Sequence, residues 1–188
     1  MRNQRSLRKR KRKTHSRSRI PPVLAVVGRA KSGKTTLVER LLHALTEKGY
    51  SVGTIKDARG GFQLDLKRKD SARHYRAGAQ GVALVSAQQR ELAFVGHLPA
   101  KLSIDELCER FFPDLDLIIL EGFKNLNFPK IETARDTRLC CENDPDLLAV
   151  VGRTPASPDD VPCFTLRDVP SLVKLIEREF DLAPRQRG

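Results

Sequence analysis

One segment near the N-terminus of the sequence has the residue types and the spacing of a phosphate-binding loop. Residues 28–35 read G-x-x-x-x-G-K-T, after an apolar run at 23–27 and before a helical pattern that starts at Lys34. The two glycines let the backbone turn its N–H groups inward, which forms a nest for an anion at a helix N-terminus. Strand, loop and helix follow in the order that this motif requires, so the sequence predicts binding of a nucleoside triphosphate.

The loop residues have different expected roles at the nucleotide. Lys34 would reach the β- and γ-phosphates, and the Thr35 hydroxyl would complete the ligand shell of a Mg²⁺ ion that also contacts phosphate oxygens. Arg29 could act on the nucleotide of a second copy in a dimer, although an exposed loop charge is the simpler interpretation. The expected nucleotide-binding residues are Gly28, Arg29, Ala30, Lys31, Ser32, Gly33, Lys34, Thr35 and Thr36.

A phosphate loop also needs a carboxylate on a neighbouring strand, on the side of the metal ion. The run 116–121 reads D-L-I-I-L-E and offers an acid at each end. Ligands of open α/β sheets gather at the carboxyl ends of strands, which favours Glu121 over Asp116, since Asp116 would lie about 15 Å away at the other end of the strand. For Glu121 itself, a metal-side role is favoured over one in capping a helix or loop. Asp57 begins a loop at the same edge and is a weaker candidate. The expected catalytic residues are Lys34 and Glu121, and the expected metal ligands are Thr35, Glu121 and Asp57.

Strand and helix patterns alternate from residue 20 onward, which is typical of a parallel sheet covered by helices. Together with the loop, this alternation predicts an α/β fold, a P-loop NTPase three-layer sandwich with a mostly parallel central sheet. We expect strands at 23–27, 51–56, 82–86, 91–95, 116–120, 146–151 and 163–166, with a polar turn between the third and the fourth. We expect helices at 34–48, 71–77, 103–111 and 168–180; the third begins with a Ser103–Glu106 capping box.

Positive charge is concentrated at the N-terminus. The net charge is +12, and residues 1–20 hold ten of the 35 Lys and Arg residues and no acid, so 25 basic and 23 acidic residues remain. We expect residues 1–19 to form a disordered basic tail, 20–182 to form one P-loop NTPase domain, and 183–188 to fray. The tail could bind an anionic partner such as RNA or a membrane surface, but a tail without function is favoured, because no aromatic residues interleave its charges.

The cysteines and the apolar runs bear on the compartment. The four cysteines are Cys108, Cys140, Cys141 and Cys163, and they form no C-x-x-C pair. Adjacent Cys140 and Cys141 are awkward for tetrahedral zinc or for an ordinary disulfide, so reduced, buried or incidental thiols are expected. No apolar run approaches the roughly 20 residues that span a bilayer, and no signal-peptide cleavage site follows the first strand. These observations predict a cytoplasmic protein without a transmembrane segment.

Several segments of the chain occur together in one known family. They are the loop with Thr36-Leu37, Lys69-Asp70-Ser71 with Ala77-Gly78-Ala79, Glu121-Gly122-Phe123-Lys124, and Pro129-Lys130-Ile131-Glu132 with Arg135. In order and spacing they resemble the family of molybdopterin-guanine dinucleotide biosynthesis protein B, called MobB. The likeness covers about Val23 to Phe180, and the combination of E-G-F-K with P-K-I-E is its specific part.

The resemblance implies a P-loop fold of the class that includes dimeric metal-maturation and signal-recognition GTPases. It implies binding of GTP and Mg²⁺, weak hydrolysis and a homodimer. It also implies a helper role beside the molybdopterin guanylyltransferase, which joins GMP to molybdopterin, and beside molybdenum cofactor insertion proteins. A polyanionic pterin such as molybdopterin, or a partner, could dock at the family's characteristic segments, in which this chain has Lys69, Asp70, Lys124, Lys130 and Arg135.

The residues themselves leave alternatives open. Lys124 and Lys130 could equally be solvated loop charges, and Lys69-Asp70-Ser71 could simply begin a helix. The family's Lys-His pattern after the second strand is replaced by Lys56-Asp57, its usual Gly before Lys-Asp-Ser is Arg68, and a Ser-Asp strand end is replaced by Gly152-Arg153. No [NT]-K-x-D segment marks guanine, so a preference for ATP stays open. A non-hydrolysing scaffold for another cofactor-maturation enzyme is the alternative to a weak GTPase, since no water-positioning Gln can be assigned.

Overall fold

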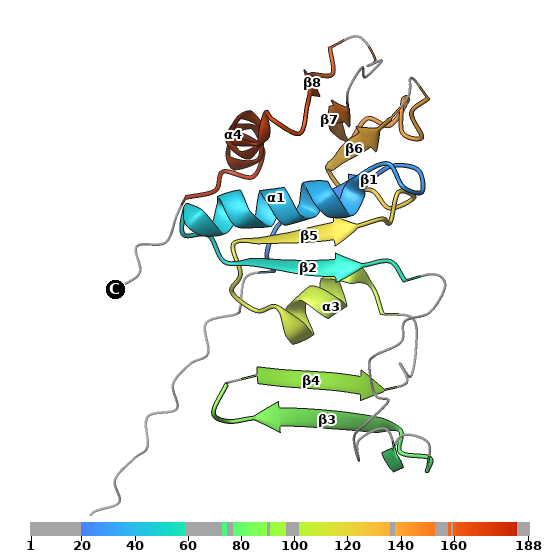
Figure 1. Ribbon diagram of the computed structural model, residues 1–188, viewed down its shortest axis with the longest axis vertical. Coiled ribbons are helices and arrows are strands. Elements are labelled where there is room, and N and C mark those ends of the chain that lie inside the picture. Colours follow the sequence, from blue (N-terminus) through green and yellow to red (C-terminus); the bar gives the residue numbers. More distant parts are fainter. Residues whose placement is uncertain are drawn as a thin grey trace, which may run out of the picture.

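Six strands of the chain form one parallel sheet (Figure 1). The computed structural model describes residues 20–58, 73–74, 77–89, 91–96, 102–135, 138–152, 158 and 160–183. Within these ranges the strand order is β2-β5-β1-β6-β7-β8, and every pairing in this sheet is parallel. The strands are β1 Val23–Val27, β2 Val52–Lys56, β5 Leu117–Glu121, β6 Lys130–Ala134, β7 Leu147–Gly152 and β8 Cys163–Phe164. The predicted parallel central sheet is confirmed.

Helices cover both faces of this sheet, as the predicted three-layer sandwich requires. Side chains of β1 alternate between the two faces because successive residues of a strand point to opposite sides. Leu24 and Val26 join a core cluster with α1 (Lys34–Glu47) and α4 (Val169–Glu179), whereas Val23, Ala25 and Val27 join a cluster with α3 (Ile104–Phe111). All five β1 residues are buried, so the strand that leads into the phosphate-binding loop lies at the centre of the core.

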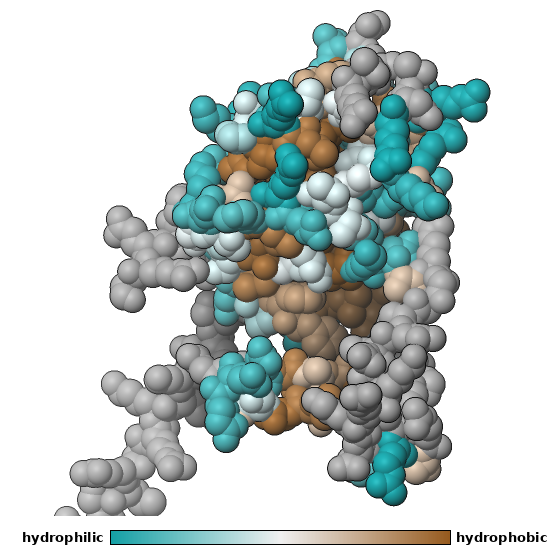
Figure 2. Space-filling model, viewed as in Figure 1, coloured by the Kyte–Doolittle hydropathy of each residue, from teal (hydrophilic) through white to brown (hydrophobic). Residues whose placement is uncertain are grey.

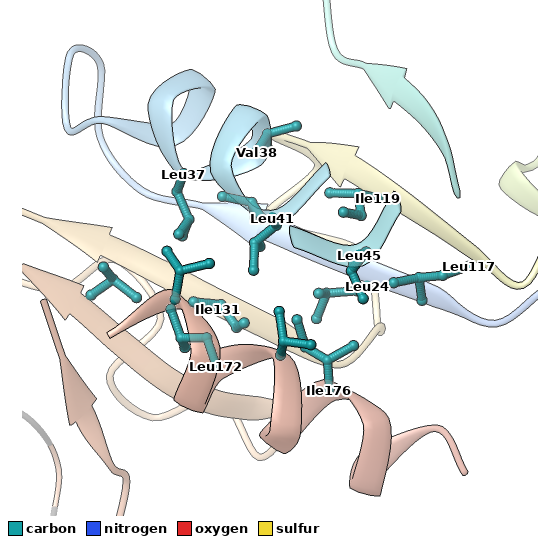
Figure 3. Packing of buried hydrophobic residues seen from close by; sticks show 14 of the residues in the cluster. Leu24, Leu37, Val38, Leu41, Leu45, Leu117, Ile119, Ile131, Leu172 and Ile176 are labelled. Atoms are coloured by element: carbon teal, nitrogen blue, oxygen red, sulfur yellow. The ribbon is translucent and has the colours of Figure 1, made fainter. Parts of the chain in front are cut away.

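Helix α1 is fixed to the sheet by one apolar stripe. Leu37, Leu41 and Leu45 follow one another at a spacing of four residues, which places them on one face of the helix. All three are fully buried and pack near Leu172 and Ile176 of α4 (Figure 3). Burial of each such side chain contributes about 1.5–3 kcal/mol, so the start of α1 is held firmly beside the end of β1.

The two strands predicted at 82–86 and 91–95 are present as β3 (Gly81–Ser86) and β4 (Glu91–Gly96), and they form an antiparallel hairpin that is a separate sheet of two strands. The predicted helix at 71–77 lies largely outside the described residues. Its described part is helical at 73–74, and Ala77 N–H donates to the Arg73 carbonyl at 2.9 Å before Gly78 adopts a left-handed φ of 103°.

The predicted capping box of α3 is formed by Ser103 and Glu106. Among the described helices, none has the length and apolarity that crossing a bilayer requires.

Strand β6 corrects the sequence prediction, which placed Lys130 in a loop as a charge facing phosphate or solvent. All five β6 residues are buried, and the strand pairs with β1 and β7. Lys130 is only 1% exposed, and its Nζ lies 2.5 Å from Asp144 Oδ2 and donates to the Leu126 carbonyl at 3.1 Å. The sequence pattern did not predict this strand, because a buried parallel strand usually appears as an apolar run and this one contains the charged residues Lys130 and Glu132.

Candidate nucleotide-binding site

The loop between β1 and α1 has a backbone that depends on its glycines. Gly28 and Gly33 have φ angles of 139° and 106°, in a region that L side chains rarely adopt. A Cβ on Gly28 would lie 2.7 Å from both Ser32 Oγ and Thr133 Oγ1, so a side chain does not fit there. Those two hydroxyls are 2.6 Å apart, and the Thr133 hydroxyl also donates to the Val27 carbonyl at 3.1 Å. Strand β6 therefore helps to hold the loop in its curved form.

The N-terminus of α1 has features that suit an anion. Its N-cap residue Gly33 supplies no side-chain hydrogen bond, and the first turn contains no acidic residue. The first N–H groups of a helix lack partners within the helix and carry partial positive charge. Lys34 Nζ lies 3.1 Å from the Gly28 carbonyl and donates to the Arg29 carbonyl at 2.7 Å, so the ammonium folds back over the loop. Phosphate oxygens could replace these two carbonyls as its acceptors.

Glu121 reaches the loop from the end of β5, next to β1 in the sheet. Thr35 Oγ1 donates to Glu121 Oε1 at 2.7 Å, and Lys56 Nζ lies 3.1 Å from the same carboxylate oxygen. Asp57 N–H donates to the Glu121 carbonyl at 3.0 Å, and a Cβ on Gly122 would lie 2.9 Å from Asp57 Cβ. The hydroxyl and the carboxylates are oxygen ligands of the kind that Mg²⁺ prefers, so the residues present fit a magnesium ion bound beside phosphate.

The structure thus brings the predicted Lys34, Thr35 and Glu121 together and places Asp57 beside them. Sequence reasoning missed Lys56, although it stands at the end of β2 at the same sheet edge as Glu121. It also missed Thr133, which could not be found once β6 was assigned to a loop. Of the residues expected to bind a pterin or a partner, Lys124 and Arg135 are exposed, whereas Lys130 is buried in an ion pair with Asp144. Residues 69 and 70 lie outside the described residues.

The parallel strand order, with the phosphate loop between β1 and α1 and an acid at the end of β5, defines a P-loop NTPase fold. The family model for molybdopterin guanine dinucleotide synthesis protein B, MobB, matches residues 23–153. This match extends over more than half of the chain. The chain belongs to the MobB family.

Relatives and solved structures agree with this assignment. A molybdopterin-guanine dinucleotide biosynthesis adapter protein of Haemophilus influenzae is 34% identical over 159 residues, covering 83% of this chain and 88% of the relative. One of Escherichia coli with the same name is 32% identical over 171 residues, covering 89% and 96%. A crystal structure of molybdopterin-guanine biosynthesis protein B superimposes with a TM-score of 0.67 at 28% identity, covering 84% of this chain and 99% of that one.

Proposed function

We propose that this protein is a GTP-binding adapter in molybdenum cofactor biosynthesis, acting where GMP is joined to molybdopterin. The family and the names of the relatives support the pathway. The observation that supports nucleotide binding is the N-terminus of α1, which has no side-chain cap, with Lys34 folded over the loop and Thr35 hydrogen-bonded to Glu121. A cytoplasmic location is supported by four free cysteines, because reducing compartments keep thiols reduced.

In this proposal the loop binds the triphosphate, and the end of β5 helps to bind the Mg²⁺ ion beside it. Backbone N–H groups of residues 28–35 hold phosphate oxygens, and Lys34 exchanges its two carbonyl acceptors for the β- and γ-phosphates. Thr35 and Glu121 hold Mg²⁺, with Asp57 close to them, and Lys56 gives up its contact with Glu121. When bound, Mg²⁺ neutralises phosphate charge.

We expect hydrolysis to be slow, because none of the described glutamines lies at the loop to position water. In the described part of the chain the glutamines are Gln80, Gln88 and Gln89, and all three lie in or beside the β3–β4 hairpin. Release of phosphate from GTP should therefore exceed that of the Lys34→Ala variant only slightly. A rate equal to that of the variant would instead favour the non-hydrolysing scaffold.

Replacing Thr35 with Val is expected to abolish the gain in GTP affinity that Mg²⁺ provides. The substitution removes the hydroxyl that contacts Glu121 Oε1 but keeps the size of the side chain. GTP affinity in the absence of Mg²⁺ should change little, because backbone groups and Lys34 would still hold the phosphates. The measurement is calorimetric titration with and without Mg²⁺. Thr46→Val is the matched control, since the Thr46 hydroxyl donates to the Leu42 and His43 carbonyls of its own helix. Equal Mg²⁺ dependence in both variants would contradict the assignment.

We also propose that the β3–β4 hairpin forms the contact between two copies in a homodimer. Val85 lies opposite Leu92, and cross-strand partners share a face. Phe94 is on the same face because it follows Leu92 by two residues along β4. These side chains are 75%, 69% and 57% exposed, and apolar surface is visible on the hairpin at the lower end of the molecule in Figure 2. Apolar patches of this kind often mark protein interfaces.

Replacing Leu92 with Glu on this hairpin face is expected to weaken dimerisation by about a hundredfold, because the interface would bury an unpaired charge. Sedimentation equilibrium measures the change directly. The matched control is Gln89→Glu, which adds the same charge at the exposed turn. Equal dimer dissociation constants for the two variants would show that the interface does not lie on this face of the hairpin.

The adapter role is tested by reconstitution. Molybdopterin, limiting GTP, Mg²⁺ and purified guanylyltransferase are combined with this protein or with its Lys34→Ala variant. We expect the wild-type protein to raise the yield of molybdopterin guanine dinucleotide and the variant to leave it at the level of the enzyme alone. A yield that the wild-type protein does not raise would contradict the role.

A further inference from the structure

Two adjacent thiols lie beside a buried carboxylate, far from the phosphate loop in the chain. Glu132 of β6 is 1% exposed; its Oε1 accepts from the Cys140 N–H at 2.7 Å, and its Oε2 accepts from the Cys141 N–H at 2.9 Å. In the residues that the structure describes, Glu132 forms no ion pair with a basic side chain. A buried carboxylate without a cation is costly, which suggests that a cation belongs here.

The spacing of the donor atoms suits a single metal ion. The Sγ atoms of Cys140 and Cys141 are 3.9 Å apart, and the thiols and the Glu132 carboxylate lie within 4.8 Å of one another. Two sulfurs bound to tetrahedral zinc at about 2.3 Å would be roughly 3.8 Å apart, so the observed distance already matches. A disulfide would need about 2.05 Å between the same atoms and therefore a different local geometry.

We propose that Glu132, Cys140 and Cys141 form a zinc site. Thiolates favour Zn²⁺ and Cu⁺, whereas a carboxylate favours harder ions, so the mixed set selects Zn²⁺. The two backbone N–H groups that bind Glu132 fix the orientation of its oxygens, as outer partners do in metal sites. Sequence reasoning judged the adjacent cysteines unsuitable for zinc because it could not know that β6 brings a third ligand to them.

Two further observations define the chemistry of this site. The thiols line an open pocket of about 600 Å³ together with Lys124 and Asn127, so a water or another exchangeable ligand can reach the fourth position. Burial, followed by hydrogen bonding to Glu132, raises the pKa of Cys140 to about 12, and burial also raises the pKa of Cys141.

The proposal is tested by titrating the reduced, chelator-treated full-length protein with Co²⁺ as a spectroscopic substitute for Zn²⁺. We expect one ion per chain and a thiolate-to-cobalt charge-transfer band that Cys141→Ser removes and Cys163→Ser, at an exposed thiol of β8, preserves. Glu132→Gln should keep the band but weaken Co²⁺ binding by about tenfold or more. Absence of the band, or its survival in a Cys140→Ser/Cys141→Ser double variant, would overturn the proposal.

Zinc-edge X-ray absorption on the wild-type protein needs no variant and therefore does not depend on whether a variant folds. We expect two sulfur neighbours at about 2.3 Å and oxygen neighbours at about 2.0–2.2 Å. A shell of oxygen and nitrogen alone would contradict the site. GTP binding by Cys141→Ser should equal that of the wild type, so failure of the zinc proposal is distinguishable from failure of the proposed nucleotide function.

Discussion

Replacing Lys34 with Ala is expected to reduce GTP affinity by about a hundredfold or more while leaving the stability of the fold unchanged. In the free protein the ammonium folds over the loop, with acceptors at the Gly28 and Arg29 carbonyls. On binding it would exchange these for phosphate oxygens, and hydrogen bonds between charged groups contribute about 1.5–3 kcal/mol each. Because about 1.4 kcal/mol corresponds to a factor of ten, loss of two such bonds gives at least the stated effect.

Calorimetric titration with GTP in the presence of Mg²⁺ measures this effect. Lys174→Ala is the matched control, because Lys174 is an exposed lysine on α4 and lies outside the loop. Both variants lose one positive charge, so a general electrostatic effect would weaken binding equally in the two. Equal GTP affinity of Lys34→Ala and the wild type would rule out the role assigned to this residue.

Replacing Lys130 with Ala is expected to lower the free energy of unfolding by about 3–5 kcal/mol, because it removes a buried side chain and the basic partner of Asp144. The Lys130 side chain is 1% exposed, and Asp144 is 23% exposed. The same ammonium also holds the Leu126 carbonyl in the turn before β6. Loss of this side chain should therefore loosen the strand that supports the phosphate loop through Thr133.

Urea denaturation measures the change, with Lys124→Ala as the control on an exposed lysine in the same segment. If the two variants were equally stable, the buried ion pair would contribute nothing. Burial is the largest single influence on the pKa of Asp144 and raises it, but the hydrogen bonds from Lys130 and from the Asp146 N–H, together with the charge of Lys130, lower the pKa below its ordinary value of 3.8. The pair thus contributes fully above about pH 4, and its contribution is lost as the pH falls through the lowered pKa. This part of the pH dependence should be absent in Asp144→Asn.

The phosphate loop could be predicted from the sequence because its conformation is determined locally. Gly28 and Gly33 have positive φ angles that L side chains rarely adopt, and the motif includes both of them together with Lys34. The position of Glu121 beside the loop could be predicted because it ends an apolar strand, and the carboxyl ends of parallel strands share one edge. The hairpin could also be predicted, since its two apolar strands flank a short polar turn.

The remaining features depend on contacts between distant segments. Lys130 and Glu132 look like surface charges in the sequence. Their strand can be buried because Asp144 pairs with Lys130 and the backbone N–H groups of Cys140 and Cys141 bind the Glu132 carboxylate. Glu132 of the same strand meets Cys140 and Cys141 of the proposed zinc site through this packing. Sequence patterns thus reveal residues in a local motif or at the end of an apolar strand, but not a site on a strand whose charged residues hide its apolar pattern.

The most direct test of the central proposal is calorimetric titration of the wild-type protein with GTP and with ATP, each with and without Mg²⁺. We expect GTP to bind at one site per chain, more tightly than ATP, and Mg²⁺ to strengthen its binding. Tighter binding of ATP, or no binding of either nucleotide, would contradict the proposal that this MobB family member is a GTP-binding adapter.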